Sequence, residues 1–508
     1  MISESGVKHT GRRVWLMSYV FFLVWNMCCT WWLVNATVTG AIVAFVANSF
    51  LMTIPFVLFH FTKKKFGNKI GYASLIVFWV CFEYVHQLWE LAYPWLNLGN
   101  VFALFPQFIQ WYSLTGVPGG TIWVLALNLL IFSETQRLAK TPPSVNNLPE
   151  SLKLFFQLVK KPALLFLGPL VLSLIMFATY TEKGIPSEIV VLQPNIDPYE
   201  RSTVAFNERY KLLDDFLAVT DSLVTDSTDY VVWPESAVPR YLRQHRLNTY
   251  PSVEKIRTYL KKEPQVSLVT GASTLKEYTA LDTIPSTARS YTNNADRFFD
   301  SFNTAIQFDH EVEEPQMYYK SKLVPGTERM PYYWLMGFLD AFKIILDEDP
   351  IAGSLGIQKE REVFVKDDIK PAPVVCYESV FGEYVTEYIN KGGNLIFIIT
   401  NDAWWGNTNG HRHHLRYASL RAIENRRAIA RSANTGVSCF IDQRGIIHQA
   451  TAYKEKAVIR QTLLANEELT FYTKYGELLS RTSIPIAILL LLNLLVSKTT
   501  GNFRMRKN

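Results

Sequence analysis

The chain has 508 residues, of which 49% are hydrophobic and 14% aromatic, and its formal net charge is +6. This apolar content is typical of a protein with a membrane-embedded part, and the length allows more than one domain. Because most of the excess positive charge flanks apolar segments, it does not indicate nucleic-acid binding.

Six apolar segments predict membrane-spanning helices. A spanning helix needs about 20 mostly apolar residues, although about 17 can suffice, and the segment at 119–132 is marginal by this criterion. No small-residue cleavage pattern follows the first segment, so we expect it to be retained as a span rather than removed as a signal peptide. Five segments precede a more polar central region and one follows it: two lie within 14–61, and the others lie at 70–91, 119–132, 162–180 and 484–496.

Lysine and arginine residues are concentrated in every second connection between these segments. They cluster before the first, after the second, between the fourth and fifth, and after the last, whereas connections 35–38 and 92–118 contain none. The positive-inside rule therefore predicts that both chain ends lie in the cytoplasm and that the large central domain lies on the opposite side. We expect a helix bundle at 1–182, a soluble domain at 183–470, and a final helix with a basic tail at 471–508.

The pattern of the central region predicts an α/β domain. Short β-branched runs alternate with helical patterns, which favours buried sheets covered by helices. Residues 279–300 are polar and predict a loop, and residues 413–433 predict one long helix. Residues 329–353 are unusually apolar and form either packed core or an arm that touches lipid. The expected tether to the membrane favours the arm, centred on 332–342.

A single cysteine, Cys376, follows the strand pattern PAPVV and precedes an acidic, helical pattern. A thiol at this position lies near the backbone N–H groups of a helix start, which lowers the thiol pKa and activates the nucleophile. A buried structural cysteine, or a disulfide with Cys439, explains the residue as well on this stretch alone.

Two other strand ends carry residues that fit the same chemistry. Glu235 ends VVWPES, where an aromatic residue and a proline provide an apolar, rigid setting that suits a general base. Lys320 follows a third strand, with Lys322 and Glu328 close behind it. If these strand ends meet at one sheet edge, the glutamate can take the thiol proton. The lysine can then stabilise the anion that forms when the thiolate attacks a carbonyl.

These residues, in this order, resemble the nitrilase superfamily, whose Glu-Lys-Cys set lies on an αββα sandwich. The similarity is closer to its membrane-bound branch, the apolipoprotein N-acyltransferases. The resemblance covers nearly the whole chain and implies a polytopic α-helical membrane bundle joined to an α/β nitrilase-like domain. The motifs that carry it are PWLNLGN and QWYSLTGVPGG in the bundle, and WPES, YYKSKLVP, CYES, TNDAWWG and RSANTG in the domain.

Carried over residue by residue, the resemblance implies that Glu235 is the general base, Lys320 the oxyanion stabiliser and Cys376 the acylated nucleophile. It further implies that Glu328 is a second glutamate of the site and that Tyr377 and Glu378 are the pair that follows the nucleophile. The tryptophans that it expects to line the pocket are Trp233, Trp404 and Trp405.

Two features depart from the family pattern. Many members read Pro-Phe-Gly-Glu where this chain reads Pro325-Gly326-Thr327-Glu328, which affects the role assigned to the glutamate. The family usually has a further amino-terminal pair of spans, and six spans here indicate that this pair is missing.

The resemblance implies transfer of an acyl chain from a phospholipid, through a thioester on Cys376, to the α-amino group of the diacylglyceryl-cysteine of an apolipoprotein. It implies no cofactor, and it places the enzyme in the bacterial inner membrane with the catalytic domain on the periplasmic side. The expected partners are therefore the phospholipid donor, the apolipoprotein acceptor and the bilayer. The Trp404/Trp405 loop is expected to keep water from the thioester.

Two other functions fit parts of the sequence. The first is a membrane-tethered amidase that uses the same three residues with water as the acceptor; the long bundle and the apolar arm argue against it, because a soluble substrate needs neither. The second is a binding module on a catalytically dead scaffold. The presence of Glu235, Lys320 and Cys376 together argues against that function.

Other polar residues give weaker signals. The HRHH sequence at 411–414 lacks metal-ligand spacing and predicts a solvated or substrate-facing helix end. Asp402 either orients loops near the site or caps a turn. Glu83 and His86 are expected to face the interior of the bundle. Four arginines predict a charged helix face paired with Glu424 rather than contacts to lipid headgroups: Arg421, Arg426, Arg427 and Arg431.

Overall fold

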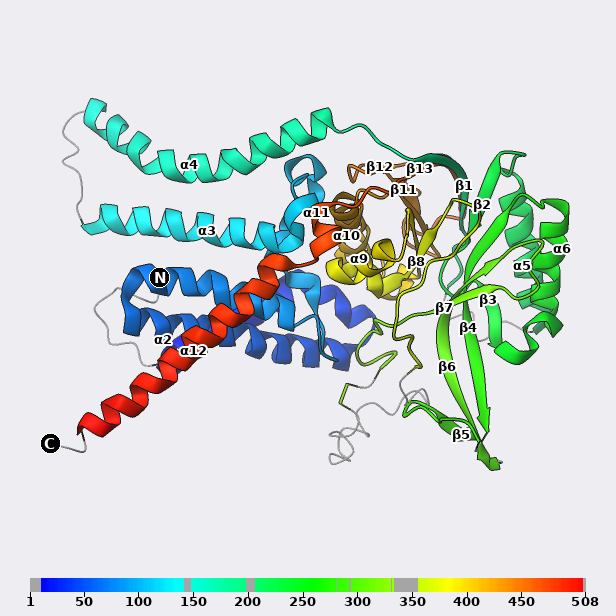
Figure 1. Ribbon diagram of the computed structural model, residues 1–508, viewed down its shortest axis with the longest axis horizontal. Helices are drawn as coiled ribbons and strands as arrows, with labels where there is room; N and C mark the ends of the chain where they lie inside the picture. Colours follow the sequence, from blue (N-terminus) through cyan, green and yellow to red (C-terminus); the bar gives the residue numbers. More distant parts are fainter. Residues whose placement is uncertain are drawn as a thin grey trace. The chain divides into compact units, whose positions relative to one another are not determined.

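The computed structural model describes residues 11–140, 148–197, 206–279, 281–291, 294–329, 331–332 and 355–505. The chain forms two compact units (Figure 1). The first unit comprises Met1–Trp31, Gly40–Tyr180 and Tyr475–Asn508, and the second comprises Trp32–Thr39 and Thr181–Lys474. The short connection between the first two spans therefore belongs to the second unit.

Long helices build the first unit, and in the part of the chain that the structure describes five of them are long and apolar enough to cross a membrane. Helix α2 has 48 residues, which at ~1.5 Å per residue is about twice the length needed for one crossing. Gly67 breaks it with φ 77° and ψ −175°, so this one helix holds two of the six expected spans. The five helices are α1 Gly11–Thr30, α2 Val38–Val85, α3 Tyr112–Lys140, α4 Leu148–Thr179 and α12 Leu478–Met505.

Glu83 and His86 face the interior of this unit, as predicted, and both are buried. The Glu83 carboxylate accepts hydrogen bonds from the Trp79 indole at 3.0 Å, the Leu98 backbone N–H at 2.8 Å and the Thr121 hydroxyl at 2.7 Å. These donors lie on α2, on the 3-10 helix η3 (Leu98–Leu104) and on α3. The carboxylate therefore links three segments of the first unit.

The second unit contains two β-sheets. The first sheet has eight strands in the order β13-β1-β2-β4-β6-β5, with β3 paired to β4 and β7 paired to β6. The second sheet has the order β12-β11-β10-β9-β8. The strands of the first sheet are β1 Ile185–Gln193, β2 Thr228–Val232, β3 Val238–Arg243, β4 Ser267–Thr279, β5 Arg289–Tyr291, β6 Asn294–Phe308, β7 Gln316–Tyr319 and β13 Ala457–Ala465. Those of the second are β8 Pro371–Val375, β9 Leu395–Thr400, β10 Ile429–Ala433, β11 Cys439–Ile441 and β12 Ile447–His448.

The two sheets pack face to face with helices outside them. Between the sheets, the Tyr230 ring lies 5.2 Å from the Phe397 ring, and the Ser432 hydroxyl donates to the Leu192 carbonyl oxygen. Helices α5 (Phe206–Asp221) and α6 (Pro251–Lys262) cover the first sheet, and α9 (Gly382–Asn390) and α10 (Asn409–Asn425) pack on the second. This αββα sandwich confirms the predicted fold class.

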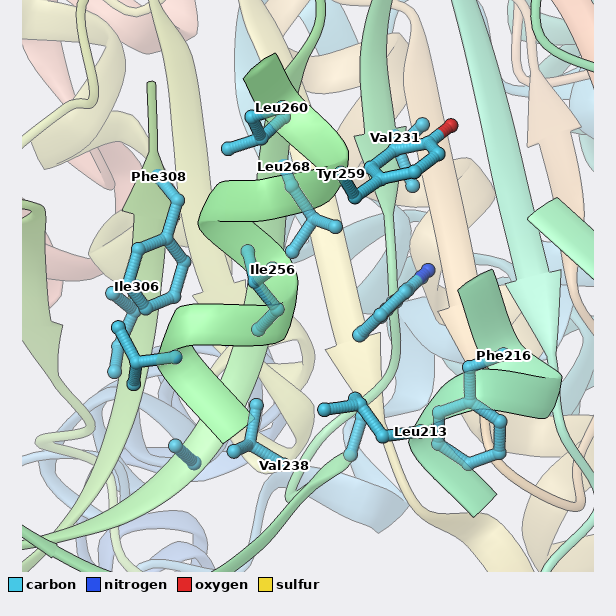
Figure 2. Packing of buried hydrophobic residues seen from close by; sticks show 14 of the residues in the cluster. Leu213, Phe216, Val231, Val238, Ile256, Tyr259, Leu260, Leu268, Ile306 and Phe308 are labelled. Atoms are coloured by element: carbon cyan, nitrogen blue, oxygen red, sulfur yellow. The ribbon is translucent and has the colours of Figure 1, made fainter. Parts of the chain in front are cut away.

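The outer core of the first sheet is apolar because α5 and α6 each present one hydrophobic stripe to it (Figure 2). Leu213 and Phe216 of α5 and Ile256 and Leu260 of α6 lie against strand residues such as Val231. All five side chains are fully or almost fully buried. This packing fixes the strand ends from which the candidate site is built.

Three local predictions differ from the structure. Helix α10 ends at Asn425 because Arg426 adopts the left-handed conformation with φ 51°, and the predicted remainder of that helix is strand β10. The predicted loop at 279–300 contains β5 and the start of β6, since its alternating residues extend a long hairpin with β4. The predicted arm at 332–342 lies outside the described residues except for Tyr332.

Candidate active site

Glu235 lies just beyond the end of β2, where the chain continues beside β4. The Trp233 N–H donates to the Val269 carbonyl oxygen, and the Gly271 N–H donates to the Pro234 carbonyl oxygen. A Cβ at Gly271 would lie only 2.5 Å from the Ser236 nitrogen, so the close approach of these two segments requires glycine there. The turn holds the Glu235 side chain in a buried position, with 8% of its surface exposed.

Lys320 follows β7 and is held by its backbone, because its N–H donates to the Asn303 carbonyl oxygen of β6 at 2.8 Å. Its ammonium lies 3.1 Å from Glu235 Oε1 and 2.8 Å from Glu328 Oε1. Burial disfavours the charged ammonium, but the nearby Glu235 and Glu328 carboxylates outweigh it, and the pKa of Lys320 lies well above its usual range. A cation is therefore fixed between two carboxylates.

Asn303 is a member of this cluster that the sequence prediction missed. Its Nδ2 donates to Glu235 Oε1 at 2.6 Å and to Glu328 Oε1 at 3.1 Å. Glu328 is held further by the Val324 N–H, which donates to its Oε2 at 2.8 Å. The signal in the sequence was an asparagine within the strand pattern FNTAIQF, because a buried amide needs polar partners.

Cys376 directly follows β8 and has a φ of 49°, in the left-handed region that residues other than glycine rarely occupy. Burial, followed by the charge of Glu235, raises the pKa of the Cys376 thiol, while Lys320 has a smaller opposing effect. The prediction that a helix start lowers this pKa is therefore wrong. Cys376 begins a five-residue 3-10 turn, Cys376–Val380, and the regular helix α9 starts only at Gly382, so the dipole effect is small against burial.

The second thiol of this unit lies apart from the cluster. Cys376 and Cys439 are both free, so the open alternative of a disulfide is not present in this structure. Cys439 is fully buried in β11, where burial raises the pKa of its thiol to about 12. It is a core residue, as the sequence predicted.

Glu378 and Tyr377 lie in the turn after Cys376, but they contact neighbours other than the thiol. The Glu378 carboxylate accepts from the Tyr318, Tyr384 and Tyr388 hydroxyls and from the backbone N–H groups of Ser321 and Val375. Tyr377 packs edge-to-face on Phe381 at 5.0 Å. Glu378 thus ties the cysteine turn to the end of β7.

The three predicted pocket tryptophans lie in different surroundings. Trp233 is fully buried in the outer core against Phe216, with its indole N–H bonded to Thr220, so it supports β2 and does not line a pocket as predicted. Trp404 is 42% exposed. Trp405 packs edge-to-face on Trp32 at 5.2 Å, and its carbonyl oxygen accepts from the Asn35 side chain. The connection between the first two spans therefore holds this loop.

The histidines and arginines of α10 and β10 are not a solvated face. His414 has no exposed surface, and His411 is buried with its ring 4.4 Å from that of Tyr453. The four arginines of the predicted face are all buried as well; Arg421 pairs with Glu424 at 2.8 Å, and Arg431 pairs with Asp402 at 2.7 Å. The prediction failed because α10 packs against the second sheet on most of its surface. In the described part of the chain, no group of His, Cys, Asp or Glu side chains could hold a metal ion.

The candidate site thus joins the ends of strands from both sheets. Glu235 and Lys320 are in direct contact, and both influence the pKa of the Cys376 thiol. A buried thiol beside a carboxylate and a fixed cation can attack a carbonyl carbon, because the carboxylate can take its proton and the cation can stabilise the oxyanion.

Comparison with known proteins identifies the family. The family model described as carbon-nitrogen hydrolase matches residues 191–466, which is more than half of the chain. The chain belongs to the carbon-nitrogen hydrolase family. Residues 2–130 match the apolipoprotein N-acyltransferase N-terminal domain, so the chain is a member of the membrane-bound apolipoprotein N-acyltransferase branch.

Similar proteins cover most of the chain. The apolipoprotein N-acyltransferase of Chlorobaculum tepidum is 28% identical over 96% of this chain and 88% of its own length. Apolipoprotein N-acyltransferase 1 of Treponema denticola is 27% identical over 86% of this chain and 79% of its own length. A crystal structure of an amidase from Nesterenkonia sp. is 14% identical, with a TM-score of 0.36, over 55% of this chain and 91% of the amidase. The whole-length relatives favour an acyltransferase over the tethered amidase, and the chain is a membrane protein.

Proposed function

We propose that this protein transfers a fatty acyl chain from a phospholipid to the α-amino group of a diacylglyceryl-cysteine on an apolipoprotein, through a thioester on Cys376. The observation that carries the proposal is the buried cluster of Glu235, Lys320, Glu328 and Asn303 beside this thiol. It occurs in a chain with membrane-spanning helices, whose relatives bear the name of this activity.

In the first half-reaction, the Cys376 sulfur attacks the ester carbonyl of the phospholipid while a carboxylate oxygen of Glu235 takes the thiol proton. The Lys320 ammonium donates to the resulting oxyanion. Collapse of the tetrahedral intermediate breaks the bond to the lipid alcohol, and Glu235 returns the proton to that oxygen. The products are a thioester on Cys376 and a lysophospholipid.

In the second half-reaction, the free α-amine of the lipoprotein attacks the thioester carbonyl. Glu235 takes the amine proton and returns it to the departing sulfur, so the amide forms and the Cys376 thiol is restored. Because the pKa of this thiol is raised by burial, little thiolate is present near neutral pH before the attack. The attack of the thiol on the phospholipid carbonyl therefore depends on Glu235 as the base.

Both lipid substrates are held in a bilayer, which fits a catalytic unit joined to spanning helices. The distribution of basic residues supports an orientation with the catalytic unit on the periplasmic side of the bacterial inner membrane. The partly exposed Trp404 and the anchored Trp405 are suited to exclude water from the thioester.

Intact-protein mass spectrometry tests this proposal. Purified protein is incubated with phospholipid vesicles beside a Cys376→Ala variant and a Cys439→Ser control. We expect an acyl-sized mass increase on the wild type and on the control that hydroxylamine removes, and none on Cys376→Ala. An unmodified wild type, with folding verified by circular dichroism, would contradict the proposal.

A further inference from the structure

The end of β9 contributes three consecutive residues to the surroundings of the site. The Thr400 side chain acts on the Cys376 thiol and lowers its pKa, against the larger effect of burial. The Asn401 backbone N–H donates to Glu235 Oε2 at 3.0 Å. The Asp402 carboxylate accepts from the Thr400 hydroxyl at 2.9 Å. A single strand end therefore contacts the nucleophile and the base and also begins a second polar network.

His414 of α10 is the centre of that second network and has no exposed surface. Its Nδ1 lies 2.9 Å from Asp402 Oδ1, and its Nε2 lies 3.0 Å from the carbonyl oxygen of Cys376. A carbonyl oxygen and a carboxylate oxygen can only accept, so Nε2 is the donor to Cys376 and Nδ1 is the donor to Asp402 in these two contacts. The same nitrogen lies 2.8 Å from the Ser379 hydroxyl, which also donates to the Cys376 carbonyl oxygen.

Asp402 is itself held in one position. Its Oδ2 accepts from Arg431 Nη2 at 2.7 Å, and Nη1 of the same arginine donates to the Val437 carbonyl oxygen. A Cβ at Gly436 would lie 2.6 Å from Oδ2, so the backbone closes tightly over the carboxylate. On the other side, the Trp405 ring packs edge-to-face on the His414 ring at 5.4 Å. The imidazole therefore has little freedom to rotate.

The backbone of Cys376 requires such support. A φ of 49° is unfavourable for a residue with a side chain and persists only where the surroundings hold it. His414 and Ser379 donate hydrogen bonds to the Cys376 carbonyl oxygen. If these hydrogen bonds are lost, the backbone can relax toward an ordinary φ, and the sulfur then moves relative to Glu235.

We propose that His414, fixed by Asp402 and Arg431, is a positioning residue that holds the Cys376 backbone so that the thiol faces Glu235. The inference rests on the proposed role of Cys376 as the nucleophile. His414 acts through the backbone carbonyl of Cys376. It does not take part in bond making.

Two variants of similar size test the proposal. In His414→Gln, the amide nitrogen can replace Nε2 as the donor to Cys376, whereas His414→Met fills the space without a donor. The rate of Cys376 alkylation by iodoacetamide is followed by peptide mass spectrometry in the purified full-length protein, together with thermal unfolding. His413→Gln is the matched control, since its ring packs near Trp32 and Tyr417.

We expect alkylation in His414→Met to be about 10- to 100-fold slower than in the wild type, because a misplaced nucleophile loses rate steeply. His414→Gln should recover most of the rate, with the two variants unfolding at similar temperatures, and the KM for phospholipid should remain unchanged. Equal alkylation rates in His414→Gln and His414→Met, whether both fast or both slow, would overturn the proposal. Alkylation needs no lipid. A wild-type protein that transfers no acyl chain would therefore refute the proposed function, while the comparison of alkylation rates would still test the role of His414.

Discussion

Two buried carboxylates lie near Cys376, and their surroundings differ. Glu235 contacts a lysine ammonium, an asparagine amide and one backbone N–H. Glu378, two residues after the cysteine, contacts three tyrosine hydroxyls and backbone N–H groups from two segments. The Glu378 carboxylate is thus surrounded by neutral donors, whereas the Glu235 carboxylate pairs with the Lys320 ammonium and raises the pKa of the Cys376 thiol.

The difference teaches that burial alone does not identify a catalytic acid or base. Both glutamates are buried, and both follow a strand end. The partners decide the role: tyrosines and backbone groups make Glu378 a structural link, and a lysine with a neighbouring thiol makes Glu235 a candidate base. Substitutions at the two positions should therefore affect different measurements.

The largest expected effect is on the chemical step. Replacing the base by Glu235→Gln should slow acyl-enzyme formation about 10²- to 10⁴-fold, because the amide cannot take the thiol proton. Thermal unfolding should shift downward as well, since the amide keeps an oxygen for Asn303 and Lys320 but turns its NH₂ toward the Asn401 N–H, so the rate is measured on the folded fraction. Single-turnover mass spectrometry measures the rate, and a variant that remains within tenfold of the wild type would exclude Glu235 as the base.

The same variant should change the pH dependence of Cys376 alkylation. Burial raises the pKa of this thiol, so it remains protonated well above neutral pH, and the thiolate population increases only toward alkaline pH. Without the base, the alkylation rate should rise about tenfold per pH unit through the mildly alkaline range. The wild type should show a flatter profile, because Glu235 assists proton removal. Identical profiles would contradict the assigned role.

The next effect is on stability. Glu378→Gln places an NH₂ group among donors and should lower the free energy of unfolding by about 3 kcal/mol, while Tyr388→Phe should cost about 1 kcal/mol. The folded fraction should still alkylate Cys376 at a rate close to that of the wild type. If Glu378→Gln is as stable as the wild type and cannot be alkylated, Glu378 belongs to the reacting groups instead.

The smallest effect is expected at the exposed edge of the site. Trp404→Ala should leave acyl-enzyme formation within about threefold of the wild type, because the side chain is partly exposed. Hydrolysis of the isolated thioester should become faster, since less apolar surface excludes water. Measuring free fatty acid released from the acyl-enzyme checks this, and an unchanged hydrolysis rate would remove Trp404 from the barrier to water.

The sequence predicted the fold class because strand and helix patterns are local and their packing is constrained. That Glu235 and Lys320 meet was only a possibility from their strand-end positions, and the family resemblance made it an expectation. The sequence did not predict that Asn303 joins this cluster, since the residues next to an asparagine in the sequence do not show which distant side chains it will contact. It also misjudged His414 and the arginines beside it. Their burial follows from the fit of α10 between other elements, and a polar composition predicts solvent exposure unless the tertiary partners are known.

The prediction of a lowered pKa for the Cys376 thiol was wrong for a related reason. The motif around Cys376 correctly indicated a strand followed by a helical turn, but the sign of the shift depends on the balance between dipole and burial. Burial is a property of the assembled sandwich. In the proposed function, a thiol that stays protonated needs a base before it can attack, which is the role proposed for Glu235.

The central claim is that Cys376 passes its acyl chain to an amine. Isolated acyl-enzyme is mixed with a diacylglyceryl-cysteine peptide that has a free α-amine, or with the same peptide N-acetylated, and both protein and peptide masses are followed. We predict that the acyl mass moves from the enzyme to the free amine as a hydroxylamine-resistant amide and stays on the enzyme with the acetylated peptide. Release of the chain as free fatty acid, at the same rate with either peptide, would contradict the account.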